Sequence, residues 1–296
     1  MLTAPGMVPT FTDSESAALN ESLDTIRDRY FFPAYLNKQQ RNLIYKDKYK
    51  QQLENSPAKV TLGDEDFDLV HVDRRKDLPA RRPLVNSILK MLRENKEWNH
   101  LAPLLEGLHT ARVTPDISMQ ERIIRQAAED NSLHDVLTCL IKVDDTGMSL
   151  KNDEVLHWVL RGLRRGAAKH NWQRKYLAKS LTQSKVLASI LEQDGHIRGK
   201  TSHSLTDDDP RANPLVIGVY LELYGINAVK YQKGQDTDGS VKSYAERAMT
   251  CLQQRKVSSA APYQMRRLTE KRSPRYRISR KASTQSSSPS FPSGTV

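Results

Sequence analysis

The sequence predicts an all-α protein, organised as a short α-solenoid of helical hairpins with extended basic termini. Leu, Ala, Gln, Lys and Arg are frequent and aromatic residues make up only 6% of the chain, a composition that favours helix over sheet. Apolar residues also recur with a period of 35 between Arg81 and Leu191, and each period contains two helical patterns. The 296 residues, 38% of them hydrophobic, are enough to bury a core.

The first element that we expect is a disordered segment at residues 1–28. Its first 26 residues contain Ser, Thr, Pro and several acids but no Lys or Arg, and its apolar residues are too few to form a core. The segment contains no apolar run long enough for a secretory signal, and it does not resemble an Arg-rich, acid-poor transit peptide. We therefore expect no recognisable N-terminal presequence.

A basic, aromatic-rich helix of about four turns is predicted at residues 29–55. Asn37 is suited to cap it, and the apolar residues that follow form one stripe. Four cations flank the stripe: Arg41, Lys46, Lys48 and Lys50. Two compatible interpretations remain open, because the stripe can dock on the body of the protein while the cations lie against RNA phosphates.

Residues 56–80 are expected to form an irregular linker. Pro57, Gly63 and an acidic cluster interrupt the helical pattern, and we expect one short extended piece at 67–72. The acidic cluster offers paired carboxylates, but no basic or aromatic pocket accompanies it in the sequence. A solvated acidic loop is therefore the better interpretation than a catalytic pair.

Helical periodicity returns at residues 81–191, where the repeat is found. A shift of 35 residues superimposes the apolar positions of the first unit on those of the second. In the first helix the matched pairs are Leu84 with Met119, Ile88 with Ile123, and Leu89 with Ile124. In the second helix they are Trp98 with Leu133, Leu101 with Val136, Leu105 with Leu140, and Leu108 with Val143. A third unit keeps the frame at Trp158 and then slips by about four residues. Each unit is predicted to be a helical hairpin that stacks on its neighbours.

Two further segments follow the repeats. Residues 192–212 are polar and rich in turn residues, which predicts a loop. An additional helical hairpin is predicted at 213–253, where Asn213 is suited to cap the first helix and Pro214 to occupy its first position.

The C-terminal tail, residues 254–296, is basic at first and then rich in Ser and Pro. Ten Lys or Arg and only one acid lie between Arg255 and Lys281, in a chain of net charge +11. Such a block attracts polyanions by counterion release, so we expect nucleic acid as the partner; a tail that only aids solubility is the alternative. The tail has too little apolar surface to become ordered before it binds. The cations expected to bind RNA are Arg266, Arg267, Lys271, Arg272, Arg275, Arg277, Arg280 and Lys281.

The turn that ends the first unit resembles a known repeat family. Residues 112–116 read RVTPD, similar to the closing phrase of pentatricopeptide repeats: Gly, an aliphatic residue, any residue, Pro, then Asp or Asn. The second unit ends with Gly147 and Met148, which match the start of that phrase but lack its Pro and Asp. The period of 35 also matches this family, whereas tetratricopeptide repeats are one residue shorter. The resemblance covers residues 81–191.

The resemblance implies RNA binding on one face of the hairpins, with one nucleotide addressed per repeat. Asn86 and Asp116 occupy the two positions that would read a base, and they resemble the family's pairing for uracil. The same positions of the second unit hold Glu121 and Lys151, which resemble no common pairing. The alternative is that the hairpins serve mainly as a packing scaffold.

No signature of an enzyme is found. The sequence contains no phosphate-binding GxxxxGK[ST] loop, no GxGxxG turn and no GxSxG elbow. The eight histidines and two cysteines have no metal-ligand spacing. We therefore expect no catalytic residue, metal, cofactor or small-molecule substrate, and the lack of a run of about 18 apolar residues predicts no membrane span.

The main hypothesis is a non-enzymatic RNA-binding protein of mitochondrial gene expression, because the family that it resembles works mainly in mitochondria and plastids. A folded body with basic extensions resembles ribosomal proteins. We therefore favour a structural subunit of the mitochondrial ribosome, or a factor bound to it, in the matrix, with ribosomal RNA and neighbouring proteins as partners. One alternative is a pentatricopeptide-type factor for the stability, processing or translation of mitochondrial messengers. Another is a protein-protein scaffold of the tetratricopeptide type.

Overall fold

The computed structural model describes residues 7–63, 65–197 and 209–254, and these residues are mainly helical. The prediction of an all-α protein is confirmed at this level. We call residues 7–80 the N-terminal region and residues 81–254 the hairpin region. The cations of the predicted tail lie outside the described residues.

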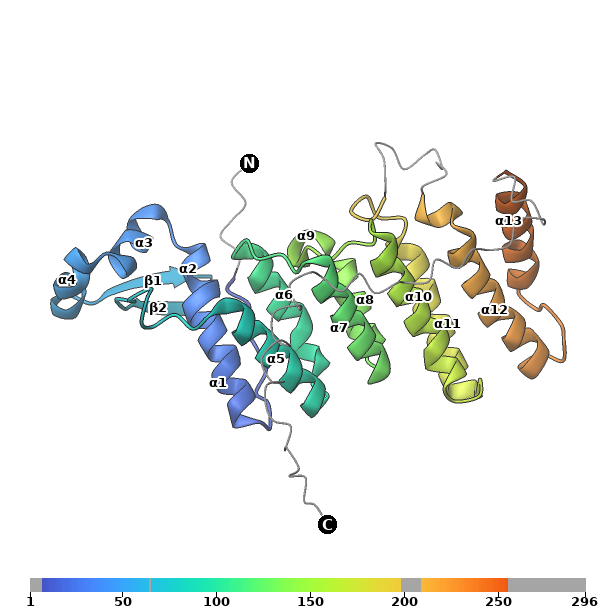
Figure 1. Ribbon diagram of the computed structural model, residues 1–296, viewed down its shortest axis with the longest axis horizontal. Coiled ribbons are helices and arrows are strands. Elements are labelled where there is room, and N and C mark those ends of the chain that lie inside the picture. The colour runs from blue at the N-terminus through green and yellow to red at the C-terminus, as the bar shows by residue number, and fades with distance from the viewer. Residues whose placement is uncertain (1–6, 64, 198–208, 255–296) are drawn as a thin grey trace, which may run out of the picture. The chain divides into compact units, whose positions relative to one another are not determined.

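The N-terminal region contains a helix where we expected disorder. Helix α1 (Ala17–Ile26) places Leu19, Leu23 and Ile26 on one face, and these side chains are at most 1% exposed. The helix packs against α5 (Arg81–Asn95) of the hairpin region (Figure 1). The predicted disorder is wrong here because α5 supplies the apolar surface that the N-terminal segment lacks by itself.

The extended chain before α1 is packed as well. Val8 is buried, and the ring of Phe11 lies 6.3 Å from that of Phe31 and 6.0 Å from that of His100. The backbone carbonyl of Pro9 accepts a hydrogen bond from Arg27 Nε at 3.2 Å. This stretch is therefore held by residues that lie far from it in the sequence.

Residues 27–55 form several short helical pieces, so the prediction of one continuous helix is wrong. The chain turns at Leu36 and Lys46, where the backbone is extended with ψ of 145° and 124°. These breaks let Phe32, Ile44 and Leu53 each reach the core from a separate piece. The pieces are a π-helical turn (Arg27–Phe31), α2 (Phe32–Tyr35), α3 (Lys38–Tyr45), a 3-10 turn (Asp47–Tyr49) and α4 (Lys50–Asn55).

The predicted irregular linker is wrong where it forms an antiparallel β-hairpin. Strand β1 (Ala58–Leu62) pairs with β2 (Glu65–Leu69), and Gly63 in the turn has φ +63°, a conformation that glycine adopts without strain. The side chains alternate, so one face of each strand packs inward, and the ring of Phe67 stacks on Phe32 at 4.6 Å. The extended piece was expected a few residues further along the chain than β2.

The hairpin region consists of helices, most of which follow one another in space in chain order (Figure 1). They are α5, α6 (Leu101–Thr110), α7 (Ile117–Glu129), α8 (Leu133–Ile141), α9 (Val143–Thr146), α10 (Asp153–Ala168), α11 (Arg174–Ile190), α12 (Pro214–Tyr231) and α13 (Ser240–Gln254). Short 3-10 turns at Trp98–His100 and Pro210–Ala212 precede α6 and α12. Helices α5, α7, α10 and α12 contact one another in that order, and α6, α8 and α11 do the same. Helices α12 and α13 pack together over the segment where we expected a further hairpin.

The turns recur with the period seen in the sequence. Lys96 and Asn131, 35 residues apart, end α5 and α7 in the left-handed conformation, with φ of 59° and 63°. In both turns the following residue donates its N–H to a helix carbonyl five positions back, which closes the helix end. Arg112 and Gly147, also 35 residues apart, have φ of 58° and 68°. The third such turn, at Asn171 with φ 50°, comes 40 residues after Asn131, in agreement with the slip in the sequence.

Side-chain caps begin several helices. Asp116 Oδ1 accepts a hydrogen bond from Met119 N–H at 2.8 Å and caps α7, which explains the Pro-Asp phrase before that helix. Asn37 caps α3 and Asn213 caps α12, with Pro214 at the first helical position, so both predicted caps are confirmed. Each cap satisfies N–H groups that have no partner within the helix.

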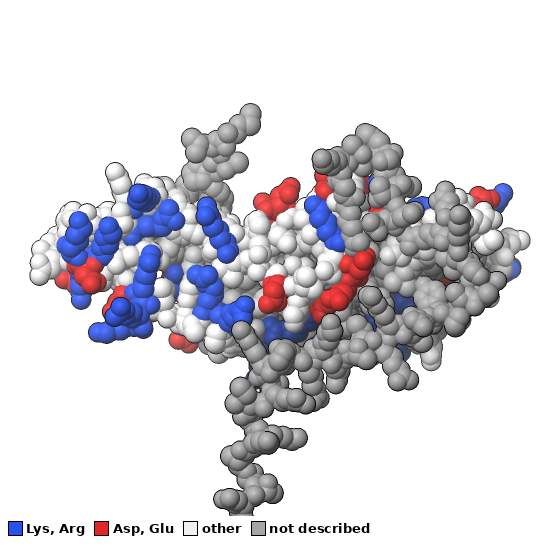
Figure 2. All heavy atoms as spheres, turned by 45° about the horizontal axis from the view of Figure 1, so that its top comes forward, with Lys and Arg blue, Asp and Glu red and all other residues white. Residues whose placement is uncertain are grey.

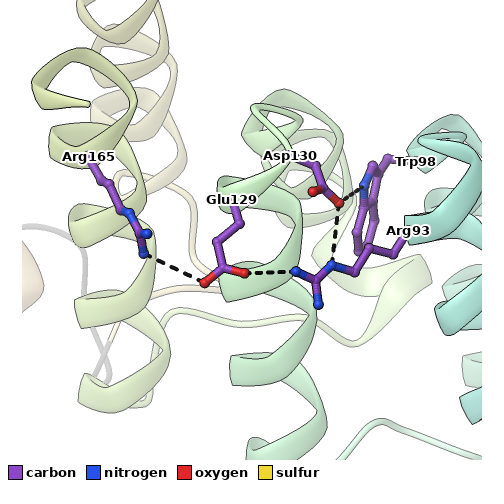
Figure 3. Close-up of polar contacts among 5 residues, drawn as sticks. All are labelled: Arg93, Trp98, Glu129, Asp130 and Arg165. Carbon is purple, nitrogen blue, oxygen red and sulfur yellow. Dashed lines mark hydrogen bonds and ion pairs between the residues drawn. The ribbon is translucent and has the colours of Figure 1, made fainter. Parts of the chain in front are cut away.

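Polar contacts join consecutive hairpins at a spacing close to the period. Arg93 Nη2 of α5 donates to Glu129 Oε2 of α7 at 3.0 Å. Glu129 Oε1 also lies 3.6 Å from Arg165 Nη1 of α10, so both partners are 36 positions away (Figure 3). Beside them, Trp98 Nε1 donates to Asp130 Oδ2 at 3.1 Å. One carboxylate therefore connects three successive hairpins.

The start of the predicted loop, residues 192–197, is folded back onto the hairpins. His196 is fully buried; its Nδ1 accepts from Leu150 N–H at 3.0 Å, and its Nε2 donates to the Leu140 carbonyl at 2.9 Å. This arrangement needs the neutral imidazole. Burial lowers the pKa of His196, only partly opposed by the hydrogen bond to Leu140.

Candidate nucleic-acid interface

The four cations predicted on the basic helix are all exposed. Arg41 lies in α3, Lys46 follows it, Lys48 lies in the 3-10 turn and Lys50 begins α4. Figure 2 shows that Lys and Arg gather over this end of the molecule. The broken helix therefore presents its cations from several short pieces, which spreads them more widely than one helical face would.

A second basic segment, residues 74–76, reaches the same surface. Val72 N–H donates to the Ile44 carbonyl at 2.8 Å, which holds this segment against the end of α3. The Arg74 guanidinium lies 4.1 Å from the centre of the Tyr45 ring, and Arg74, Arg75 and Lys76 are exposed. Sequence reasoning missed this convergence, because the two segments meet through long-range contacts, the backbone hydrogen bond of Val72 and the contact of Arg74 with Tyr45, that no local pattern reveals.

Three of the four residues predicted on the repeat face line one cleft. Asn86, Asp116 and Glu121 border a hollow of about 360 Å³ between α5, α7 and α10. Lys151 is exposed in the turn before α10 and does not line that hollow. The predicted second pair, Glu121 with Lys151, is therefore not brought together in this cleft.

Two of these cleft residues already have partners within the chain. Asn86 Oδ1 accepts a hydrogen bond from Arg122 Nη2 at 2.5 Å. Asp116 Oδ1 is the cap of α7. A base could be read by this pair only if these internal hydrogen bonds were shared or broken, so their position supports a role in the fold.

Glu121 lies in an unusual electrostatic setting. Burial raises the pKa of its carboxyl, and the hydrogen bond with Glu154 and the charge of Glu154 raise it further, while Arg125 lowers it. The two carboxyl groups, on α7 and α10, are therefore close enough to compete for one proton.

Sequence reasoning also missed the aromatic and cationic side chains of this cleft. Arg82, Arg122, Arg125 and Trp158 line it beside the predicted residues. A signal was available, because Trp158 and Arg161 lie three residues apart in α10 and so share one helix face. In the alignment of the repeats, Trp158 was interpreted only as one of the recurring apolar positions. Its partial exposure to solvent was therefore not expected.

Neither a metal centre nor a membrane span is found in the part of the chain that the structure describes. No group of three or more His, Cys, Asp or Glu residues there could hold a metal ion. No helix among residues 7–63, 65–197 and 209–254 is both long and apolar enough to cross a bilayer.

Stacked helical hairpins and an exposed cationic surface define a predominantly helical protein whose surface suits a polyanionic partner. A family model described as mitochondrial ribosomal protein mS27 matches residues 2–290. The chain therefore belongs to the mitochondrial ribosomal protein mS27 family, which confirms the main hypothesis at the level of the family and implies a mitochondrial location.

A curated relative agrees with this assignment. Small ribosomal subunit protein mS27 of Neurospora crassa is 25% identical over 187 residues, which make up 63% of this chain and 47% of the relative. The chain thus spans about half the length of the curated relative that it matches.

Proposed function

We propose that this protein is a structural, non-enzymatic component of the small subunit of the mitochondrial ribosome, in the matrix, and that it contacts ribosomal RNA and neighbouring ribosomal proteins. The match of the mS27 family model to residues 2–290 is the main support. The relative from Neurospora crassa, named as a protein of the small subunit, supports the choice of subunit.

The hairpin region is the rigid body of this component, a short α-solenoid similar to pentatricopeptide or tetratricopeptide arrays. The left-handed turns 35 residues apart support this interpretation. So do the polar contacts between consecutive hairpins at a spacing of 36 residues, such as Arg93 with Glu129. Repeated contacts between neighbours are what give such arrays their stiffness.

Ribosomal RNA is contacted mainly through phosphates. Arg41, Lys46, Lys48 and Lys50 are exposed at one end of the molecule, beside the basic segment 74–76. Cations at a surface of this kind bind the RNA backbone without reading its sequence. The tail cations extend the same role, and Asn86 and Asp116 act mainly in the fold because their side chains have partners inside the chain.

The proposal is tested by sedimentation of the full chain with small ribosomal subunits from purified mitochondria, at increasing salt. The variant carries Glu in place of Arg41, Lys46, Lys48 and Lys50. A matched control reverses four exposed cations of the hairpin region: Lys169, Arg174, Lys175 and Lys185.

We expect the N-terminal variant to bind more weakly, with the slope of log affinity against log salt reduced by about 3, since each lost phosphate contact removes about 0.7–0.9. The control variant should keep most of the slope of log affinity against log salt that the unaltered chain shows. Failure of the unaltered chain to sediment with the small subunit would overturn the proposal. A preference for uracil-containing RNA that is lost in Asn86→Ala would instead favour a messenger-specific factor.

A further inference from the structure

The cleft between α5, α7 and α10 has the size and lining of a site for a small ligand. Its volume of about 360 Å³ suits one planar group with a charged substituent rather than a helix or a duplex. Its lining includes Arg82 from α5, Arg122 and Arg125 from α7, and Trp158 from α10. The site is therefore cationic and has one large aromatic wall.

Trp158 is only half-buried, although it packs against the core at one edge. A second, smaller hollow, lined by Trp158, Ala128 and Gly162, continues from the indole along α10. Part of the indole therefore faces solvent, where a planar ligand can reach it. The solvent-facing part of the indole is apolar surface that a planar ligand would cover on binding.

Two guanidinium groups accompany this indole. The central carbon of Arg161 lies 5.0 Å from the ring centre and that of Arg125 lies 5.8 Å from it. Among the described residues, no carboxylate lies within 4 Å of the guanidinium nitrogens of Arg125, Arg161 or Arg82. By contrast Arg164, three residues further along α10, pairs with Glu222 at 2.7 Å.

An aromatic face beside unpaired arginines fits a nucleotide better than an acidic peptide. A base would cover the indole, and its stacking is worth more than the exposed cation–π contact that it would displace. The displaced guanidinium is then free to hold the phosphate. An acidic peptide would use the arginines but give the indole no role. Only an unpaired base offers its face, because the bases of a duplex stack on one another.

We infer that the cleft holds one unpaired RNA nucleotide, with its base stacked on Trp158 and its phosphate held by Arg125 and Arg161. This inference rests on the proposed function, which makes the RNA ribosomal. The site differs from the predicted Asn86 and Asp116 pair, whose oxygens are already used inside the chain.

The test uses the full chain and two probes at fixed low salt. One probe is a single-stranded RNA of about 12 nucleotides with one 2-aminopurine; the other is the same strand paired with its complement. The variants are Trp158→Ala, Trp158→Phe and the double change Arg125→Gln with Arg161→Gln. The matched control is Arg174→Gln with Lys175→Gln, two exposed cations of α11.

We expect Trp158→Ala to weaken single-strand binding about tenfold, to abolish the quenching of 2-aminopurine and to leave duplex binding unchanged. Trp158→Phe should keep most of the affinity, because a ring remains for stacking. The arginine pair should weaken binding more than the control. These three results together would support the site.

The inference is overturned if Trp158→Ala weakens both probes equally, or if Trp158→Phe binds as poorly as Trp158→Ala. It is also overturned if poly-glutamate competes as well as RNA. Unchanged single-strand binding in Trp158→Ala would overturn this site alone. The proposed function would not be affected by that result, because it is tested separately by sedimentation with the small subunit. A chain that binds neither probe would overturn both.

Discussion

The N-terminal region and the hairpin region reach a packed state by different routes. In the hairpin region the turns recur every 35 residues, and polar partners such as Arg93 and Glu129 lie 36 apart. In the N-terminal region each element has its own partner: α1 packs on α5, and Phe67 stacks on Phe32. A repeated pattern is therefore visible locally, whereas the order of the N-terminal region depends on surfaces that other parts of the chain supply.

The largest effect on this comparison is expected from Leu23→Ala in α1. Leu23 is 1% exposed, and removing a buried leucine side chain costs about 3 kcal/mol of unfolding free energy. Urea unfolding of the full chain measures it. Leu252→Ala in α13 is the control, because Leu252 is 40% exposed and should change stability by less than about 0.5 kcal/mol. Equal small effects would mean that α1 contributes nothing, as a disordered segment would.

Gly107→Ala should disturb the packing of α6 of the hairpin region against Phe31 of the N-terminal region. A Cβ at Gly107 in α6 would lie 2.2 Å from Phe31 Cε2, and the ring of Phe31 is fully buried, so it has no room to move away. We expect a loss of about 2 kcal/mol, measured by thermal unfolding.

The matched control for this change is Gly218→Ala in α12. A Cβ there meets no atom within 4 Å, so the substitution should stabilise the helix by about 0.5–1 kcal/mol through its lower backbone entropy. A gain of stability in Gly107→Ala as well would show that α6 and Phe31 do not pack closely.

A smaller effect is expected from pH, through His196 in the hairpin region. Burial lowers the pKa of His196, so the folded chain binds this proton less tightly than the unfolded chain does. The contribution of buried, neutral His196 to the free energy of unfolding is therefore complete above the pKa of histidine in the unfolded chain, about 6.5. This contribution is lost as the pH falls below that value. Unfolding curves between pH 7.5 and about 5 measure it. His196→Gln should flatten this dependence, and an unchanged slope in that variant would contradict the assignment.

The smallest effect is expected from the contacts between hairpins. Arg93 and Glu129 are 42% and 32% exposed, so solvent screens their attraction and a double-mutant cycle should give a coupling of about 0.5 kcal/mol. The pair of Lys90 and Glu94, more exposed and within one helix, is the comparison. A coupling for Arg93 with Glu129 below that of this pair would mean that the contact adds nothing to the stacking of hairpins.

The sequence predicted the hairpin region well because its signals are local and repeated. Ile88 with Ile123, and Trp98 with Leu133, are buried at both positions of each aligned pair. The cap at Asn213 could be predicted for a similar reason, since a cap acts on N–H groups two or three residues away.

The N-terminal region and the cleft were predicted less well, for different reasons. Helix α1 has only three buried residues, too few to indicate a core until the apolar side of α5 is known. The β-hairpin was visible as alternating residues on both sides of Gly63, but the acidic cluster obscured this signal. Of the two guanidinium groups beside Trp158, Arg161 lies on the same helix face, but Arg125 comes from another helix and no spacing along the sequence reveals it.

The packing of α1 and the π-helical turn (Arg27–Phe31) against α5 and α6 has a further consequence. Each later hairpin has one side covered by the hairpin before it. In the first hairpin, which has no predecessor, α1 and the π-helical turn cover that side. Without this cover, the first hairpin would expose an apolar surface on which a second copy of the chain could stack. Repeated stacking of this kind would produce head-to-tail filaments. The N-terminal region thus covers the side of the first hairpin that faces away from the second hairpin.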